Sequence, residues 1–112
     1  MKKARILVTG ASGFVGSHIV MELCRAGHHL TAVLGSSYSK SAYFRSAGAD
    51  VVFGGKLTRD TVWDHYLKGI DTVIHCLGKS QISTYPSNDS VTELYEANVE
   101  VTKSLLVGVV DS

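Results

Sequence analysis

The chain has 112 residues, of which 45% are apolar and 19% charged, a composition typical of one globular domain and unlike that of disordered or collagen-like chains. Eleven basic residues against ten acidic ones give a net charge of +1, and no basic block is longer than Lys2-Lys3, which excludes the charge pattern of a nucleic-acid-binding protein. We therefore expect one domain over residues 1–112, with neither nucleic acid nor membrane among its partners.

Cysteine usage and the first residues bear on the cellular compartment. Cys24 and Cys76 lie far apart, and neither belongs to a CxxC pair, so we expect two buried free thiols. The basic start is followed by an apolar stretch of only residues 6–8, too short for an export signal. We expect a cytoplasmic protein.

Short apolar runs alternate with helical periodicity in the first half of the chain. Val15, Ile19, Leu23 and Ala26 recur every three or four residues and predict one face of a helix that ends at Gly27. The elements predicted in this half are a strand over 5–9, a helix over 14–26, a strand over 30–34, a short helix over 40–47 and a strand over 50–53.

The second half continues the alternation. We predict a helix over 59–67 with Thr58 as its N-cap and Val62, Tyr66 and Leu67 on its inner side, and then a very apolar strand over 70–77. A polar loop over 78–89 leads to a last helix capped by Ser90. Its inner face would carry Leu94, Asn98, Val101, Leu105 and Val109. Alternating strands and helices predict an α/β fold with a parallel sheet, strand order 3-2-1-4 and helices on both faces.

A glycine motif, TGASGFVG, covers residues 9–16 at the junction of the first strand and helix. Gly10 would allow a sharp turn, Gly13 would let a diphosphate approach the backbone, and Gly16 would let the helix pack close to the sheet. The free N–H groups and positive dipole end of that helix favour an anion. The alternative is that the glycines serve only strand–helix packing.

Three motifs in order resemble the extended short-chain dehydrogenase/reductase superfamily, which includes NAD(P)-dependent epimerases, dehydratases and dihydroflavonol-reductase-like enzymes. They are TGASGFVG, DTVIHCLG at 71–78, and YEAN followed by VEVT at 95–102. The resemblance implies a Rossmann-like dinucleotide-binding sheet. It also implies that residues 12–15 (Ser12, Gly13, Phe14, Val15) hold the diphosphate, that Leu77 and Gly78 line the nicotinamide side, and that Asn98 supports the cofactor-side loop or a proton path.

The end of the second strand bears on the choice between NAD and NADP. Relatives that prefer NAD carry an acid there, whereas residues 33–37 contain none. Ser36, Ser37 and Lys40 could instead bind a 2′-phosphate, so we expect NADP rather than NAD. Two observations leave the alternative open, because Gly35 stands where relatives that use NADP often have Arg, and the three residues could form a solvated loop.

The position after the third strand departs from the family pattern. Relatives place an Asp-Leu pair there, and the Asp contacts the adenine amine, but this chain has Lys56-Leu57. A lysine can only donate hydrogen bonds, so that contact would have to be made differently.

Catalysis in the superfamily uses a Tyr and a Lys four positions later, and none of the five tyrosines has that Lys. We assign no catalytic residue and no metal ligand. In the family the pair follows a fifth strand, so we expect a Rossmann-like fold truncated before strand five, the N-terminal portion of a larger enzyme. The exposed edge of strand four would then favour self-association.

The leading interpretation is the cofactor-binding part of an NAD(P)-dependent oxidoreductase or epimerase that transfers hydride at a sugar or alcohol/ketone carbon. A non-catalytic dinucleotide-sensing module and an inert truncated fragment are the alternatives.

Overall fold

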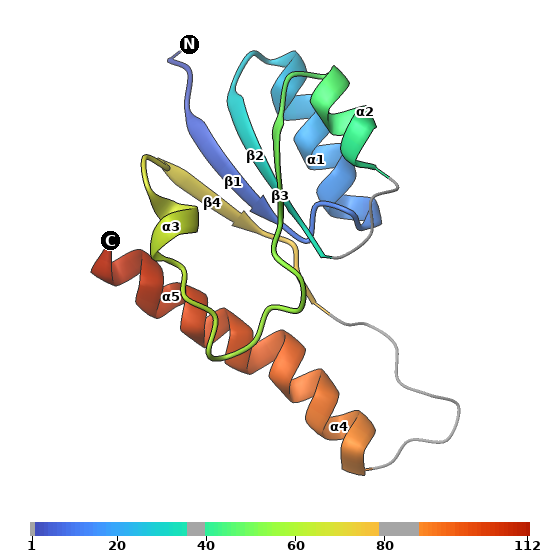
Figure 1. Cartoon of the computed structure of the whole chain (residues 1–112), viewed down its shortest axis with the longest axis vertical. Helices are drawn as coiled ribbons and strands as arrows, with labels where there is room; N and C mark the ends of the chain where they lie inside the picture. The colour runs from blue at the N-terminus through green and yellow to red at the C-terminus, as the bar shows by residue number, and fades with distance from the viewer. Residues whose placement is uncertain (1, 36–39, 79–87) are drawn as a thin grey trace.

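The chain forms a four-stranded, all-parallel sheet with the strand order β3-β2-β1-β4, as predicted (Figure 1). The computed structural model describes residues 2–35, 40–78 and 88–112. The strands are β1 (Arg5–Thr9), β2 (His29–Leu34), β3 (Asp50–Phe53) and β4 (Thr72–His75). The helices are α1 (Phe14–Arg25), α2 (Ser41–Ser46), α3 (Asp64–Leu67), α4 (Asn88–Tyr95), the π-helical segment η1 (Glu96–Glu100) and α5 (Val101–Asp111).

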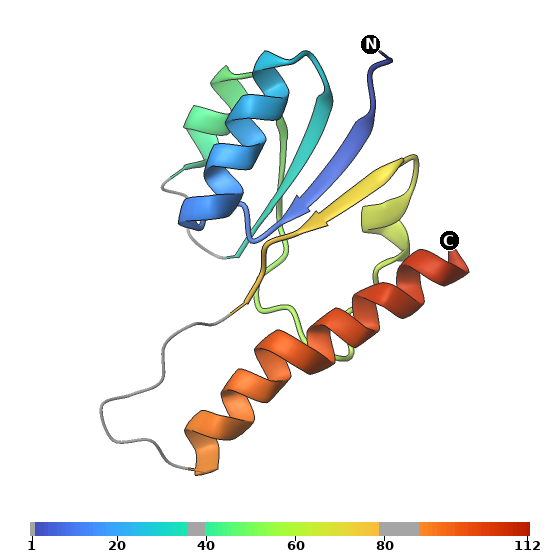
Figure 2. The same cartoon turned by 180° about the vertical axis from the view of Figure 1, so that it is seen from behind.

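Helices cover both faces of the sheet, which confirms the predicted layering (Figures 1 and 2). Alternate residues of a strand point to opposite faces, so β1 contributes to two cores. Ile6 and Val8 pack in the core under α1 and α2. Leu7 packs in the other, with Trp63 beside α3 and Leu105 of α5. Because helices cover both faces, residues 6–8 of β1 and 32–34 of β2 are continuous apolar runs rather than alternating ones.

Helix α1 begins and ends where the sequence indicates, with Gly13 as its N-cap and Gly27 at φ +89° after its last turn. Its inner face was predicted correctly only in part: Ile19 and Leu23 are half-buried and pack against the core, as expected. The buried face carries Gly16 and Val20, whereas Val15 is 61% exposed. Gly16, which has no side chain, lies against the backbone of Gly10 and Ala11, and Val15 beside it points away from the core.

The predicted helix over 59–67 is also wrong, because only Asp64–Leu67 is helical. The Thr58 hydroxyl accepts a hydrogen bond from the Asp60 N–H, and the Thr61 hydroxyl accepts one from the Thr58 N–H at 2.8 Å. These local bonds compete with a helical first turn. Val62, predicted on the inner side, is 64% exposed, while Trp63 is buried and donates its indole N–H to the Ser104 hydroxyl.

The last helix begins at Asn88, two residues before the predicted Ser90 cap, and contains a π-helical turn that periodicity does not predict. Val101 and Leu105 are buried as expected. Val109 lies 39% exposed at the open side of α5.

The two cysteines are unpaired, as predicted, but both are half-buried rather than buried. Burial raises the pKa of the Cys24 thiol. Within residues 2–35, 40–78 and 88–112, no helix is long and apolar enough to cross a membrane.

Candidate functional site

The glycine motif lies at the carboxyl ends of β1 and β4. Gly10 adopts φ +65°, and a Cβ there would lie 2.6 Å from the Cys76 carbonyl carbon and the Leu77 nitrogen. A side chain on Gly16 would meet the Gly10 carbonyl oxygen. The two glycines therefore allow three backbone segments to converge at one end of the sheet (Figure 1).

The first turn of α1 faces this convergence with backbone N–H groups that have no hydrogen-bond partner among the residues that the structure describes. The N–H groups of Phe14, Val15 and Gly16 precede the first intrahelical bond, which the Ser17 N–H donates to the Gly13 carbonyl at 3.0 Å. The first turn holds no acidic residue, and no side chain caps it. The positive end of the helix dipole is therefore available to an anion.

A hollow of about 400 Å³ opens beside this turn. It brings together seven residues predicted from sequence and one that was not, Cys76. Its lining is Gly10, Gly13, Phe14, Val15, Gly16, Cys76, Gly78 and Asn98. The Phe14 side chain is 80% exposed at its rim.

A second hollow, of about 580 Å³, shares Gly78 with the first. It contains the predicted Lys56, Leu57 and Leu77. The other lining residues, which sequence reasoning missed, are Gly55, Thr92, Glu93, Glu96 and Ala97. One face of the predicted helix carries four of these residues at helical spacing: Thr92, Glu93, Glu96 and Ala97. That shared face is the sequence pattern that could have indicated them.

The remaining predicted residues lie elsewhere. Lys40 donates a hydrogen bond from Nζ to the Ser12 carbonyl oxygen at 2.8 Å, so its ammonium rests against the glycine loop. Neither Ser12 nor Lys40 lines the two hollows. Ser36 and Ser37 lie outside the described residues.

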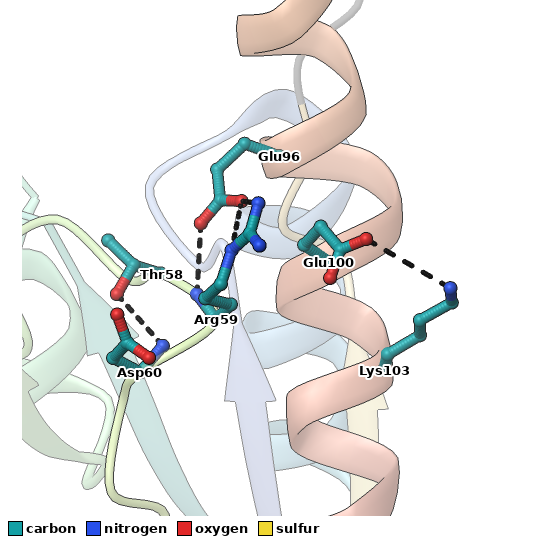
Figure 3. A network of polar contacts seen from close by, with 6 residues as sticks. All are labelled: Thr58, Arg59, Asp60, Glu96, Glu100 and Lys103. Carbon is teal, nitrogen blue, oxygen red and sulfur yellow. Dashed lines mark hydrogen bonds and ion pairs between the residues drawn. The ribbon is translucent and has the colours of Figure 1, made fainter.

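An ion pair joins the loop after β3 to the π-helical segment at the second hollow (Figure 3). Glu96 accepts hydrogen bonds from the Arg59 backbone N–H at 3.0 Å and from the guanidinium at 3.0 and 3.1 Å. The backbone bond from Arg59, followed by its guanidinium, lowers the pKa of the Glu96 carboxyl, while the same pairing raises the pKa of Arg59. This ion pair therefore holds the loop that carries Lys56 and Leu57 close to the π-helical segment on the other side of the second hollow.

Comparison with known proteins gives a consistent result. The model of the NAD dependent epimerase/dehydratase family matches residues 6–110. The chain is 31% identical over 100 residues to the decarboxylating sterol-4-alpha-carboxylate 3-dehydrogenase of Dictyostelium discoideum, covering 89% of this chain and 29% of that protein. It therefore spans less than a third of that relative's length.

Two solved structures are similar in fold and sequence. One is UDP-glucose-4-epimerase from Stenotrophomonas maltophila with bound NAD and formylated UDP-arabinopyranose, at 27% identity and a TM-score of 0.75, covering 96% of this chain and 34% of that one. The other is MoeE5 in complex with UDP-glucose and NAD, at 30% identity and a TM-score of 0.72, covering 93% and 31%. With its glycine motif, its strand order and a family match over nearly its whole length, the chain belongs to the NAD dependent epimerase/dehydratase family.

Proposed function

We propose that this chain is the dinucleotide-binding part of an NAD(P)-dependent oxidoreductase or epimerase that acts by hydride transfer on a sugar or on an alcohol/ketone carbon. The nicotinamide supplies the hydride acceptor or donor. The observation that carries the proposal is the hollow at the first turn of α1, where free backbone N–H groups and the helix dipole face a surface lined by glycines.

The residues around the hollow fit such a cofactor. Backbone N–H groups of residues 14–16 would bind the diphosphate, and Gly13 leaves its approach free of a side chain. Leu77, Gly78 and Asn98 would face the nicotinamide half. The second hollow, with Lys56 and Leu57 opposite α4, offers room for the adenosine half.

NADP is the form we propose. The end of β2 at residues 33–35 carries no carboxylate that would repel a 2′-phosphate. Lys40 already directs its ammonium at the adjacent glycine loop, and an ammonium has further N–H groups for phosphate oxygens. This proposal distinguishes the chain from the two solved structures, which contain NAD.

The test is calorimetric titration of the chain with NADP⁺ and NAD⁺, comparing wild type with Gly13→Ala. Gly13 has φ −74°, and its added Cβ would make only an ordinary contact of 3.4 Å with the Gly10 carbonyl, so the variant should fold. We expect it to bind at least about tenfold more weakly, because the methyl group blocks close approach of the diphosphate.

The control is Ser46→Ala on α2, which introduces the same side chain away from both hollows and should leave affinity unchanged. If neither NADP⁺ nor NAD⁺ gives a heat of binding, the proposal is refuted and an inert fragment is favoured. Binding without turnover of any alcohol or ketone by the full-length protein would favour a sensing module.

A further inference from the structure

His75, at the end of β4, contacts two hydroxyl groups from different elements. Its Nδ1 lies 2.6 Å from the Thr9 Oγ1 of β1, and its Nε2 lies 3.0 Å from the Thr102 Oγ1 of α5. Thr9 has no exposed surface, and His75 is half-buried. The imidazole therefore bridges the carboxyl ends of the neighbouring strands β1 and β4 and the helix α5.

The neighbouring bonds determine which atom donates in each contact. The Thr102 hydroxyl donates its single hydrogen to the Asn98 carbonyl oxygen at 3.1 Å, so its oxygen can only accept from His75 Nε2–H. In a neutral imidazole Nδ1 is then the acceptor, and the Thr9 hydroxyl donates to it. The Thr9 oxygen in turn accepts the Leu77 N–H at 3.4 Å.

These bonds form one chain that runs from Leu77 through Thr9, His75 and Thr102 to Asn98. Its members adjoin the first hollow. Thr9 directly precedes Gly10, Leu77 directly precedes Gly78, and Asn98 lines the hollow itself. We propose that His75, as the neutral Nε2–H tautomer, is a positioning residue that fixes the separation of the β1 and β4 ends and of the π-helical segment, and thereby shapes the dinucleotide site.

Protonation would break this chain at a defined point. An imidazolium donates from both nitrogens, so Nδ1 could no longer accept from Thr9, whose hydroxyl hydrogen is shielded from water. No charged group forms a hydrogen bond with His75 among the described residues. The residues of β1 and α5 that contact His75 are the two threonines. His75 also lines a groove beside β4 and α5, and Asp71 is the acidic residue in the lining of that groove. Burial lowers the pKa of His75, which agrees with a neutral ring at neutral pH.

The first arm of the test needs no ligand. Long-range ¹H–¹⁵N correlation spectra of the ¹⁵N-histidine-labelled chain report the tautomer of each ring. We expect His75 to be neutral with the proton on Nε2 at pH 7. A proton on Nδ1, or a charged ring at this pH, would overturn the proposal.

The second arm measures the dissociation constant for NAD⁺, whose diphosphate does not titrate here, from about pH 8 to about pH 4.5, a range that extends well below the ordinary histidine value because burial lowers the pKa of His75. Affinity should weaken by about tenfold as His75 protonates, the loss expected when one buried hydrogen-bond partner is removed. An affinity that stays constant or rises as the pH falls would contradict the proposal.

Two variants separate positioning from mere packing. His75→Asn places an amide oxygen near the Nδ1 position, so it retains an acceptor for Thr9 but cannot protonate, and its affinity should lose the pH dependence. The matched control, His65→Gln, replaces an exposed histidine of α3 and should keep the wild-type profile. Identical profiles for wild type and His75→Asn would refute the positioning role.

This inference rests on the proposed function only in its binding arm. If the chain binds no dinucleotide at any pH, the proposed function fails, while the tautomer of His75 still decides whether the hydrogen-bond chain exists.

Discussion

Replacing Lys40 with Gln tests the proposed preference for NADP. Its ammonium lies 2.8 Å from the Ser12 carbonyl oxygen and is half-buried beside the glycine loop. A hydrogen bond from a charged donor contributes about 1.5–3 kcal/mol, and partial exposure with salt screening places this one at the lower end. Gln retains an N–H donor for Ser12 but removes the charge, so NADP⁺ affinity should fall by roughly tenfold, or about 1.4 kcal/mol.

The assay is parallel calorimetry with NADP⁺ and NAD⁺ at one fixed ionic strength. Because NAD⁺ lacks the 2′-phosphate, its affinity should change by less than about twofold, well below the loss expected for a charge-assisted bond. Lys68→Gln, which follows α3 and lies away from both hollows, serves as the charge-matched control. An equal loss for both dinucleotides would mean that Lys40 only shapes the glycine loop. A wild type that binds NAD⁺ more tightly would refute the assignment itself.

Three further predictions concern stability and association. Gly10→Ala should lower the free energy of unfolding by at least about 1–2 kcal/mol, measured in urea, because φ +65° disfavours any side chain. The clash with the backbone of Cys76 and Leu77 would add to this loss. Glu96→Gln should destabilise the chain at pH 7. The difference in stability between wild type and Glu96→Gln should shrink as the pH falls below the ordinary carboxyl pKa of 4.5 and through the lowered pKa of Glu96. Protonation of Glu96 in the wild type removes the same ion pair with Arg59 that the substitution removes. A difference that stays constant down to about pH 2 would contradict this. We also expect self-association along the open edge of β4 and the adjoining side of α5, which sedimentation over a concentration series would detect. Leu106→Lys should reduce it, whereas Val62→Lys, equally exposed elsewhere, should not.

The strand order and the position of the glycine loop could be predicted because local and global signals agree in those regions. The run of residues 5–9 is apolar and β-branched, a glycine follows it, and helical periodicity begins at once. Parallel strands with short right-handed crossovers leave few topologies, and the order 3-2-1-4 is one of the common ones. The gathering of Gly10, Gly16 and Gly78 at one hollow follows from the same geometry.

The errors arose where side chains compete with the backbone or where a tertiary contact decides. Thr58 and Thr61 hydrogen-bond locally, so a segment with helical spacing forms turns instead. The close contact of Gly16 with the glycine loop rotated α1 by a fraction of a turn, which periodicity cannot reveal. The second hollow depends on residues of α4, including Glu93, that come 35 or more positions after Lys56 and Leu57 in the sequence.

The π-helical turn at Glu96–Glu100 implies that the last helix tolerates the deletion of a single residue at this point (Figure 3). A π turn holds one residue more than an α-helical turn of similar length. Deleting one residue inside it would convert the segment to α-helix without rotating the buried stripe of Val101 and Leu105 against the sheet. The same deletion within α5 would turn that stripe by about 100° and expose it. A scan of single-residue deletions along the last helix should therefore find its most permissive stretch beside Asn98.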